Sequence, residues 1–229
     1  MAARCRTLAE VPGTTLSLHA RPKPLLRGWL HVGAFGLSIP AGIVLVVVAP
    51  GIGARVAAVV YWLTLTALFG VSGLYHRGDW GENAHARMRT LDHSMIFLLI
   101  AGTYTPFCVT VLEPPLAWWV LGIAWGGAAI GIGTKLYRVD LHILSGFMYV
   151  GLGWVVVVAF PSIARALEGW QIAAMVTGGV LYTLGALVLA MHRPDPFPRH
   201  FGYHEIWHAA TIAAAACLYT VILSVYLSA

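Results

Sequence analysis

The chain has 229 residues, of which 59% are hydrophobic and only 10% charged, and its mean hydropathy is +0.78. An ordinary soluble domain carries about 25% charged residues, so the composition excludes the soluble enzyme and binding-module classes. The net charge of +5 does not predict a nucleic-acid partner, because the cations of so apolar a chain are expected to fix membrane topology.

The chain is expected to divide into a short tail and one membrane domain. Residues 1–27 contain four scattered cations before Arg27, namely Arg4, Arg6, Arg21 and Lys23, but no apolar core of the signal-peptide type. They are predicted to form a cytoplasmic tail. Residues 28–229 are predicted to form a single all-α domain, a bundle of transmembrane helices. The three cysteines show no paired spacing and predict no disulfide framework.

Seven apolar segments are long enough to cross a bilayer, which takes about 20 residues each. They are predicted at about 28–49, 55–76, 91–112, 116–134, 141–160, 170–191 and 203–227. Pro50-Gly51 and Pro161 are expected to end the first and fifth spans. A polar link over 77–90 and a proline-rich link over 193–198 separate the second span from the third and the sixth from the seventh.

The positive charges predict the orientation of these spans. Seven spans place the tail and the second, fourth and sixth links on one side of the membrane, and twelve of the 14 lysine and arginine residues lie there. The other side holds only Arg55 and Arg165. Because cytoplasmic segments carry the excess of cations, the N-terminus is predicted inside and the C-terminus outside.

This topology brings several ionisable side chains to one layer near the cytoplasmic side. His204 and His208 lie one helical turn apart at the start of the seventh span, and His76 ends the second. Ser72 lies one turn deeper than His76, and Asp92 and His93 begin the third span. Ionisable groups within spans are costly and tend to face the bundle interior. Three histidines match the three protein ligands of many catalytic zinc sites.

A metalloprotease site is one alternative, because His204-Glu205-Ile206-Trp207-His208 fits the H-E-x-x-H motif, with Glu205 as general base. That site needs a third ligand, often downstream, and only Cys217 follows His208 among the usual ligand types. Glu205 also lies about 100° around the helix from His204. A second alternative is that the two histidines are unrelated residues at a helix end near lipid headgroups.

The motifs carry a family resemblance. Ser72-Gly-Leu-Tyr-His76 fits S-x3-H, Arg89-Thr-Leu-Asp92-His93 precedes Ala101-Gly-Thr-Tyr-Thr-Pro106, and His204-x3-His208 is the third motif. In this order the motifs resemble those of the haemolysin III branch of the progestin and adipoQ receptor family, related to alkaline ceramidases. The resemblance covers about 29–223. It implies that His76, His204 and His208 bind Zn²⁺ and that Asp92 and Ser72 lie beside the water that zinc binds.

Two functions remain open from the sequence. The first is a zinc-dependent intramembrane hydrolase of a lipid amide or ester, with Asp92 as general base and Ser72 orienting the water or stabilising the oxyanion. The second is non-enzymatic, with structural zinc in a regulator of membrane lipid homeostasis or in a membrane-permeabilising protein. Both make membrane lipids the partners, and we expect the protein in the plasma membrane of a bacterium. The roles of His93 and Glu205 stay undecided, with Asp92 favoured over its neighbour His93 because the two lie about 100° apart on one helix.

Overall fold

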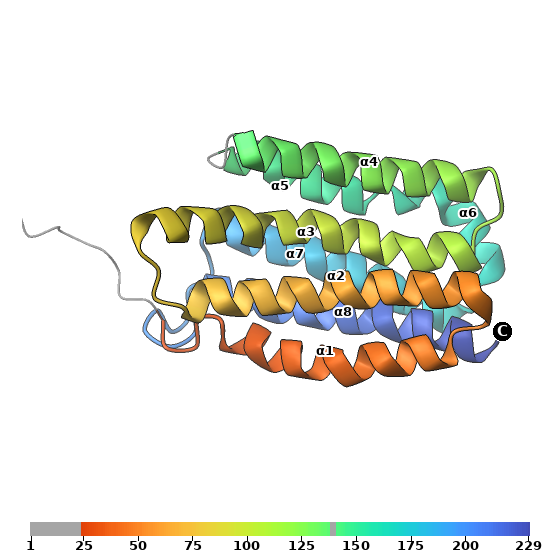
Figure 1. Cartoon of the computed structure of the whole chain (residues 1–229), viewed down its shortest axis with the longest axis horizontal. Coiled ribbons are helices and arrows are strands. Elements are labelled where there is room, and N and C mark those ends of the chain that lie inside the picture. The colour runs from red at the N-terminus through yellow and green to blue at the C-terminus, as the bar shows by residue number, and fades with distance from the viewer. Residues whose placement is uncertain (1–23, 138–140) are drawn as a thin grey trace, which may run out of the picture.

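The fold is a bundle of long helices, as a computed structural model of the chain shows for residues 24–137 and 141–229 (Figure 1). The helices are α1 (Trp29–Val48), α2 (Gly51–Arg77), α3 (Glu82–Thr110), α4 (Leu116–Tyr137), α5 (His142–Gly153), α6 (Val156–Ala166), α7 (Gly169–Met191) and α8 (Tyr203–Leu227). Within the described residues, seven helical stretches are long and apolar enough to cross a membrane, with α5 and α6 together forming the fifth. The prediction of a seven-span helical membrane protein is confirmed.

Helix α3 begins earlier than the sequence analysis predicted. Residues 82–90 were expected to belong to a polar link, but they form the first two turns of α3, which starts at Glu82. The segment Glu-Asn-Ala-His-Ala-Arg-Met-Arg-Thr is rich in residues of high helix propensity, so it is helical despite its polarity. The connection from α2 to α3 is therefore very short, and it holds the end of α2 close to the start of α3.

The fifth span also differs from the prediction. Pro161 does not end it but lies inside α6, and the helix is interrupted instead at Trp154 and Val155. The hydroxyl group of Tyr104, on α3, donates to the carbonyl oxygen of Gly153 at 2.7 Å and accepts from the amide of Val156 at 2.8 Å. Backbone groups freed at membrane depth need partners within the protein, and Tyr104 supplies them at this break.

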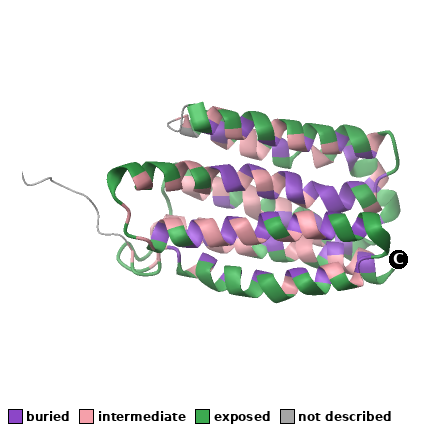
Figure 2. Cartoon of the chain, viewed as in Figure 1, coloured by how far each residue is buried: buried purple, intermediate pink, exposed green. Residues whose placement is uncertain are grey.

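The centre of the bundle is formed by α2 and α3, which bury more of their surface than the outer helices (Figure 2). The two helices approach closely, since a Cβ atom on Gly102 would lie 2.0 Å from the Oγ1 atom of Thr64. Small residues permit such approaches between membrane helices. The outer faces carry exposed apolar side chains such as Leu37, Val47 and Trp119, as a lipid-facing surface requires.

Helix α8 is joined to α1 and α2 by tyrosine hydroxyl groups. Tyr219 donates to the carbonyl oxygen of Ala41 in α1 at 2.9 Å, and Tyr226 donates to that of Ala54 in α2 at 3.0 Å. At the other end of α8, the turn before α1 pairs with the link before α8, where the amide of Leu25 donates to the carbonyl oxygen of Arg199 at 3.0 Å. The start of α1, the end of α2 and the start of α8 therefore meet at one end of the bundle (Figure 1).

Candidate metal centre

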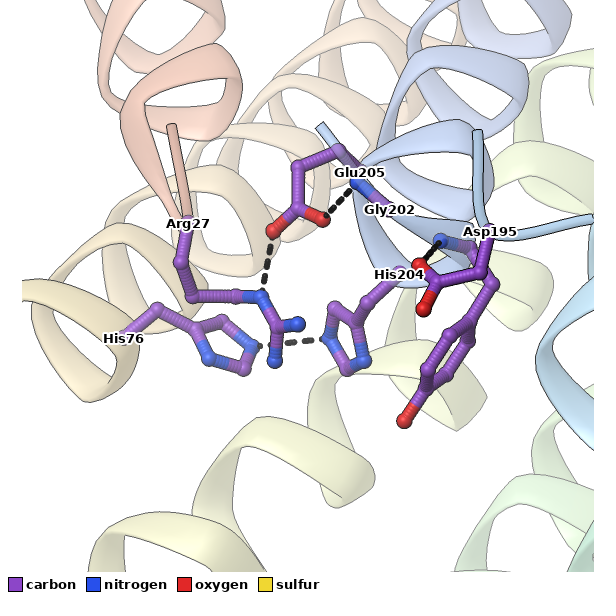
Figure 3. A network of polar contacts seen from close by, with 7 residues as sticks. Arg27, His76, Asp195, Gly202, His204 and Glu205 are labelled. Carbon is purple, nitrogen blue, oxygen red and sulfur yellow. Dashed lines mark hydrogen bonds and ion pairs between the residues drawn. The ribbon is translucent and has the colours of Figure 1, made fainter. Parts of the chain in front are cut away.

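Three histidines converge at this end of the bundle. His76 lies in the last turn of α2, and His204 and His208 occupy the first two turns of α8. One ring nitrogen of each histidine lies within 4.8 Å of the corresponding nitrogens of the other two. The Nε2 atoms of His76 and His204 are 3.2 Å apart (Figure 3). The sequence-based prediction that these three side chains reach one point agrees with this arrangement.

The spacing of the imidazoles of His76 and His204 fits a tetrahedral metal ion. Two nitrogens at about 2.0–2.1 Å from one tetrahedral zinc ion lie roughly 3.3 Å apart, close to the separation of the two Nε2 atoms. His76 and His208 are buried, and the Nδ1 atom of His208 has no hydrogen-bond partner within residues 24–137 and 141–229. A buried cluster of neutral imidazoles with an unpartnered nitrogen is costly unless a cation satisfies it. The three histidines could therefore hold a metal ion.

Asp92 and Ser72, the two predicted catalytic residues, lie on α3 and α2 near the histidines. Ser72 is buried on α2, one turn from His76, and its side chain interacts with that of Asp92 on α3. A serine hydroxyl can donate to a carboxylate, so Ser72 offers Asp92 a donor within the protein. Asp92 is half-buried, and it lines the same cavity as His76 and His204. A proton acceptor is therefore held within the reach of the candidate metal site.

The cavity at the site has a volume of about 300 Å³. Its lining contains four histidines, an aspartate, an arginine, a tyrosine and a glycine: His76, His85, His93, His204, Asp92, Arg27, Tyr75 and Gly78. Asp92 was favoured over His93 as the residue that faces the metal, and both residues line the cavity. The backbone carbonyl of His93 also accepts a hydrogen bond from Tyr149 at 3.0 Å, which ties α3 to α5.

Glu205 has a structural position that differs from that of a metalloprotease base. Its side chain is fully buried, with Oε2 accepting from the amide of Gly202 at 2.8 Å and Oε1 in an ion pair with the Nε atom of Arg27 (Figure 3). The first contact caps the start of α8, where an acidic group is favoured. Both carboxylate oxygens are thus engaged away from the imidazoles, which argues against the H-E-x-x-H interpretation.

The residues at the start of the first span that lie next to the cluster were missed by sequence reasoning. His31, in the first turn of α1, is buried with 3% of its surface exposed, and its ring stacks on that of His208 with centroids 3.8 Å apart. Gly28 caps α1 with φ of +84°, and a Cβ atom there would lie 2.7 Å from the Cβ of His76. The depth argument that grouped His204 with His76 also applies to the start of the first span, so it could have identified His31 and Arg27.

Comparison with known proteins agrees with the motifs and the geometry. A model of the haemolysin-III related family matches residues 19–219. Hemolysin-3 of Bacillus cereus is 36% identical over 196 residues, covering 84% of this chain and 86% of that protein. The Hemolysin-3 homolog of Bacillus subtilis is 31% identical, covering 82% and 86%. The human monocyte to macrophage differentiation factor is 28% identical, covering 72% and 68%. The chain is thus an integral membrane protein that belongs to the haemolysin III family, a branch of the progestin and adipoQ receptor family.

Proposed function

We propose that the protein is a zinc-dependent intramembrane hydrolase that cleaves an amide or ester bond of a membrane lipid. The observation that carries the proposal is the position of Asp92, which lines one cavity with His76 and His204, two members of the histidine cluster that His208 completes. A structural metal site needs only its ligands. A carboxylate positioned next to an incomplete ligand set of three histidines is typical of catalytic zinc sites.

Each side chain has a defined part in the proposed reaction. A bound zinc ion would polarise the scissile carbonyl and bring the pKa of a water molecule toward about 7. Asp92 accepts the proton from the attacking water and returns it to the leaving amine or alcohol. The hydroxyl of Ser72 donates to Asp92 and keeps the carboxylate oriented. The second turn of α8 fixes His208, whose ring is supported by the stacked ring of His31.

The location of the cavity supports a lipid as the substrate. The site lies at one end of helices whose outer surfaces are apolar, and its volume of about 300 Å³ is at the lower limit of ligand pockets. Such a volume suits the polar part of a lipid around the scissile bond, with the acyl chains outside the cavity. We place the protein in a bacterial plasma membrane, as its similarity to the two Bacillus proteins favours.

A comparison of lipids and metal content tests this proposal. Purified wild-type protein is incubated with membrane lipids, and the lipids are analysed by mass spectrometry beside an Asp92→Ala variant and an Asp79→Asn variant. Asp79 is an exposed acid in the link between α2 and α3, outside the cavity, so its replacement controls for a lost carboxylate at the same end. We expect one lipid class to be consumed by wild type and Asp79→Asn only. Zinc-loaded protein that consumes no lipid would refute the hydrolase.

The non-enzymatic alternative has one observation in its favour, namely that one relative is named Hemolysin-3 and another Hemolysin-3 homolog. In that alternative the zinc is structural and the protein regulates lipid homeostasis or permeabilises membranes. Dye release from vesicles, measured for wild type and Asp92→Ala, distinguishes the two functions. A permeabilising protein needs no general base, so release that is equal for both proteins, without lipid turnover, would favour the alternative.

A further inference from the structure

Arg27 reaches the candidate metal centre from a segment that contributes none of its ligands. It lies in the turn immediately before α1, and its side chain is 16% exposed. Its Nε atom is engaged by the buried carboxylate of Glu205, and Glu205 is itself fixed by the amide of Gly202. In Figure 3 the guanidinium extends from Glu205 toward the imidazoles of His76 and His204, and all three side chains line the cavity.

The guanidinium keeps unused hydrogen-bond donors. An arginine side chain has five N–H donors in a planar fork, and the contact with Glu205 uses the one on Nε. The two terminal nitrogens have no hydrogen-bond partner within the described parts of the chain, 24–137 and 141–229, and the residue is part of the cavity lining. A fork with one side fixed by a buried acid and the other side open to a cavity is suited to bidentate recognition of an oxyanion.

The charges around the cavity point in the same direction. The positive charge of Arg27 and the negative charge of Glu205 cancel. Histidines bind metals as neutral imidazoles, and the carboxylate of Asp92 offsets half the charge of a divalent ion. With such an ion in place, these groups would therefore carry one net positive charge in a partly enclosed, low-dielectric space. A ligand with one negative charge would complement them, whereas a cationic group would be repelled.

We propose that the cavity takes a carboxylate or phosphate group and that Arg27 recognises this oxyanion through its terminal nitrogens. The inference rests on the proposed function, since the oxyanion would belong to an anionic lipid substrate or to the carboxylic acid released from it. Arg27 is then a specificity-determining residue, and the buried Glu205 is the residue that positions it. The preferred substrates are lipids with an acidic group next to the scissile bond, or lipids whose acid product binds before it leaves.

Anion binding can be measured without turnover, so the test is separate from the test of the hydrolase. Zinc-loaded protein in detergent is titrated with inorganic phosphate and, in a second arm, with acetate, by calorimetry. Phosphate represents a lipid headgroup and acetate the carboxylate of a product. The variants are Arg27→Gln, Arg27→Lys and the control Arg77→Gln. Arg77 is a cation at the same end whose guanidinium stacks on Trp29 and does not line the cavity.

We expect wild type and Arg77→Gln to bind at least one anion with equal affinity. Arg27→Gln should bind it about 10- to 100-fold more weakly, the loss typical of removing charge-assisted hydrogen bonds. Arg27→Lys should lie between them, because lysine keeps the charge but lacks the planar fork. The stronger of the two anions identifies which lipid group the site accepts.

Arg27→Gln leaves Glu205 as an unpaired buried charge, which can destabilise the fold. A second comparison avoids this problem by using Glu205→Gln against the double variant Arg27→Gln/Glu205→Gln. In both proteins the glutamine can accept from the amide of Gly202, so they differ only at Arg27. Zinc content and melting temperature are measured for each. The proposal would be overturned if the two proteins of this pair bound the anion with equal affinity. It would also be overturned if wild type bound neither anion saturably, or if Arg27→Lys bound both anions as tightly as wild type.

Discussion

Asp92 and Glu205 are two acids near the three histidines, and their replacement by amides should have different effects. Asp92→Asn keeps the shape of the side chain and an oxygen that can accept from Ser72, so we expect the local geometry and the three histidines to be preserved. It removes the proton acceptor. Loss of a general acid–base group typically lowers turnover about 10²–10⁴-fold, so we expect a decrease of at least that order with zinc retained.

Glu205→Gln should instead affect stability. Glutamine can still accept from the amide of Gly202, but the ion pair with Arg27 becomes a hydrogen bond to a neutral partner. The difference between charged and neutral hydrogen bonds predicts a loss of about 1 kcal/mol in the free energy of unfolding. Glu205→Leu would leave Arg27 and the amide of Gly202 without their acceptor, and a broken buried pair costs about 3–5 kcal/mol.

The assay measures turnover of the lipid identified by mass spectrometry, together with zinc content and thermal unfolding in the same preparations. Asp79→Asn is the matched control for a carboxylate replaced outside the cavity. The reasoning would be refuted by an inactive Glu205→Gln and an active Asp92→Asn, both with full zinc. That result would assign the base to Glu205 and restore the metalloprotease interpretation.

Three further predictions concern the metal, the topology and the packing of the site. Alanine at His76, His204 or His208 should remove the single zinc ion per chain, and elemental analysis showing full zinc in all three variants would exclude this ligand set. A reporter fused after Ala229 should be active only outside the cytoplasm, because twelve of the 14 lysine and arginine residues lie on the side predicted to be cytoplasmic; cytoplasmic activity would contradict the orientation. Gly28→Ala should lower stability by at least about 1–2 kcal/mol, the cost of a left-handed backbone for a residue with a Cβ, and should weaken zinc binding by displacing His76. Gly33→Ala is the control, since a Cβ there meets nothing within 4 Å, and equal melting temperatures and zinc affinities for the two variants would refute the packing argument.

The sequence was sufficient to predict the spans and the main cluster because two independent constraints act together. Bilayer thickness fixes the length of each span, and alternation of the spans fixes the end at which each residue lies. These constraints place His76 at the same depth as His204 without any knowledge of helix contacts. Helical periodicity then places Ser72 on the face of His76 and His208 on that of His204. The order of the spans therefore contained most of the information about the cluster.

The interruption of the fifth span could not be predicted in the same way. Pro161 was the local candidate, but a proline within a membrane helix is tolerated when neighbouring groups compensate for it. The actual break at Trp154 is stabilised by the hydroxyl of Tyr104, which comes from another helix. A tertiary hydrogen bond of this kind has no local sequence pattern. The extension of α3 over 82–90 could have been predicted, because these residues have high helix propensity. Their polarity led to the prediction of a link instead.

Arg27 and His31 show why span ends are difficult to interpret. A cation or histidine at that depth is equally compatible with lipid headgroups and with the interior of the bundle, and the choice depends on the rotation of the helix about its axis. For α1 that rotation is set by contacts that a sequence does not display, such as Gly28 against His76 and the pairing of Leu25 with Arg199. In the observed rotation the ring of His31 stacks on that of His208, and Arg27 forms an ion pair with Glu205. The first span therefore belongs to the site although it supplies none of the three candidate ligands, and variants at its start should alter zinc or anion binding as well as stability.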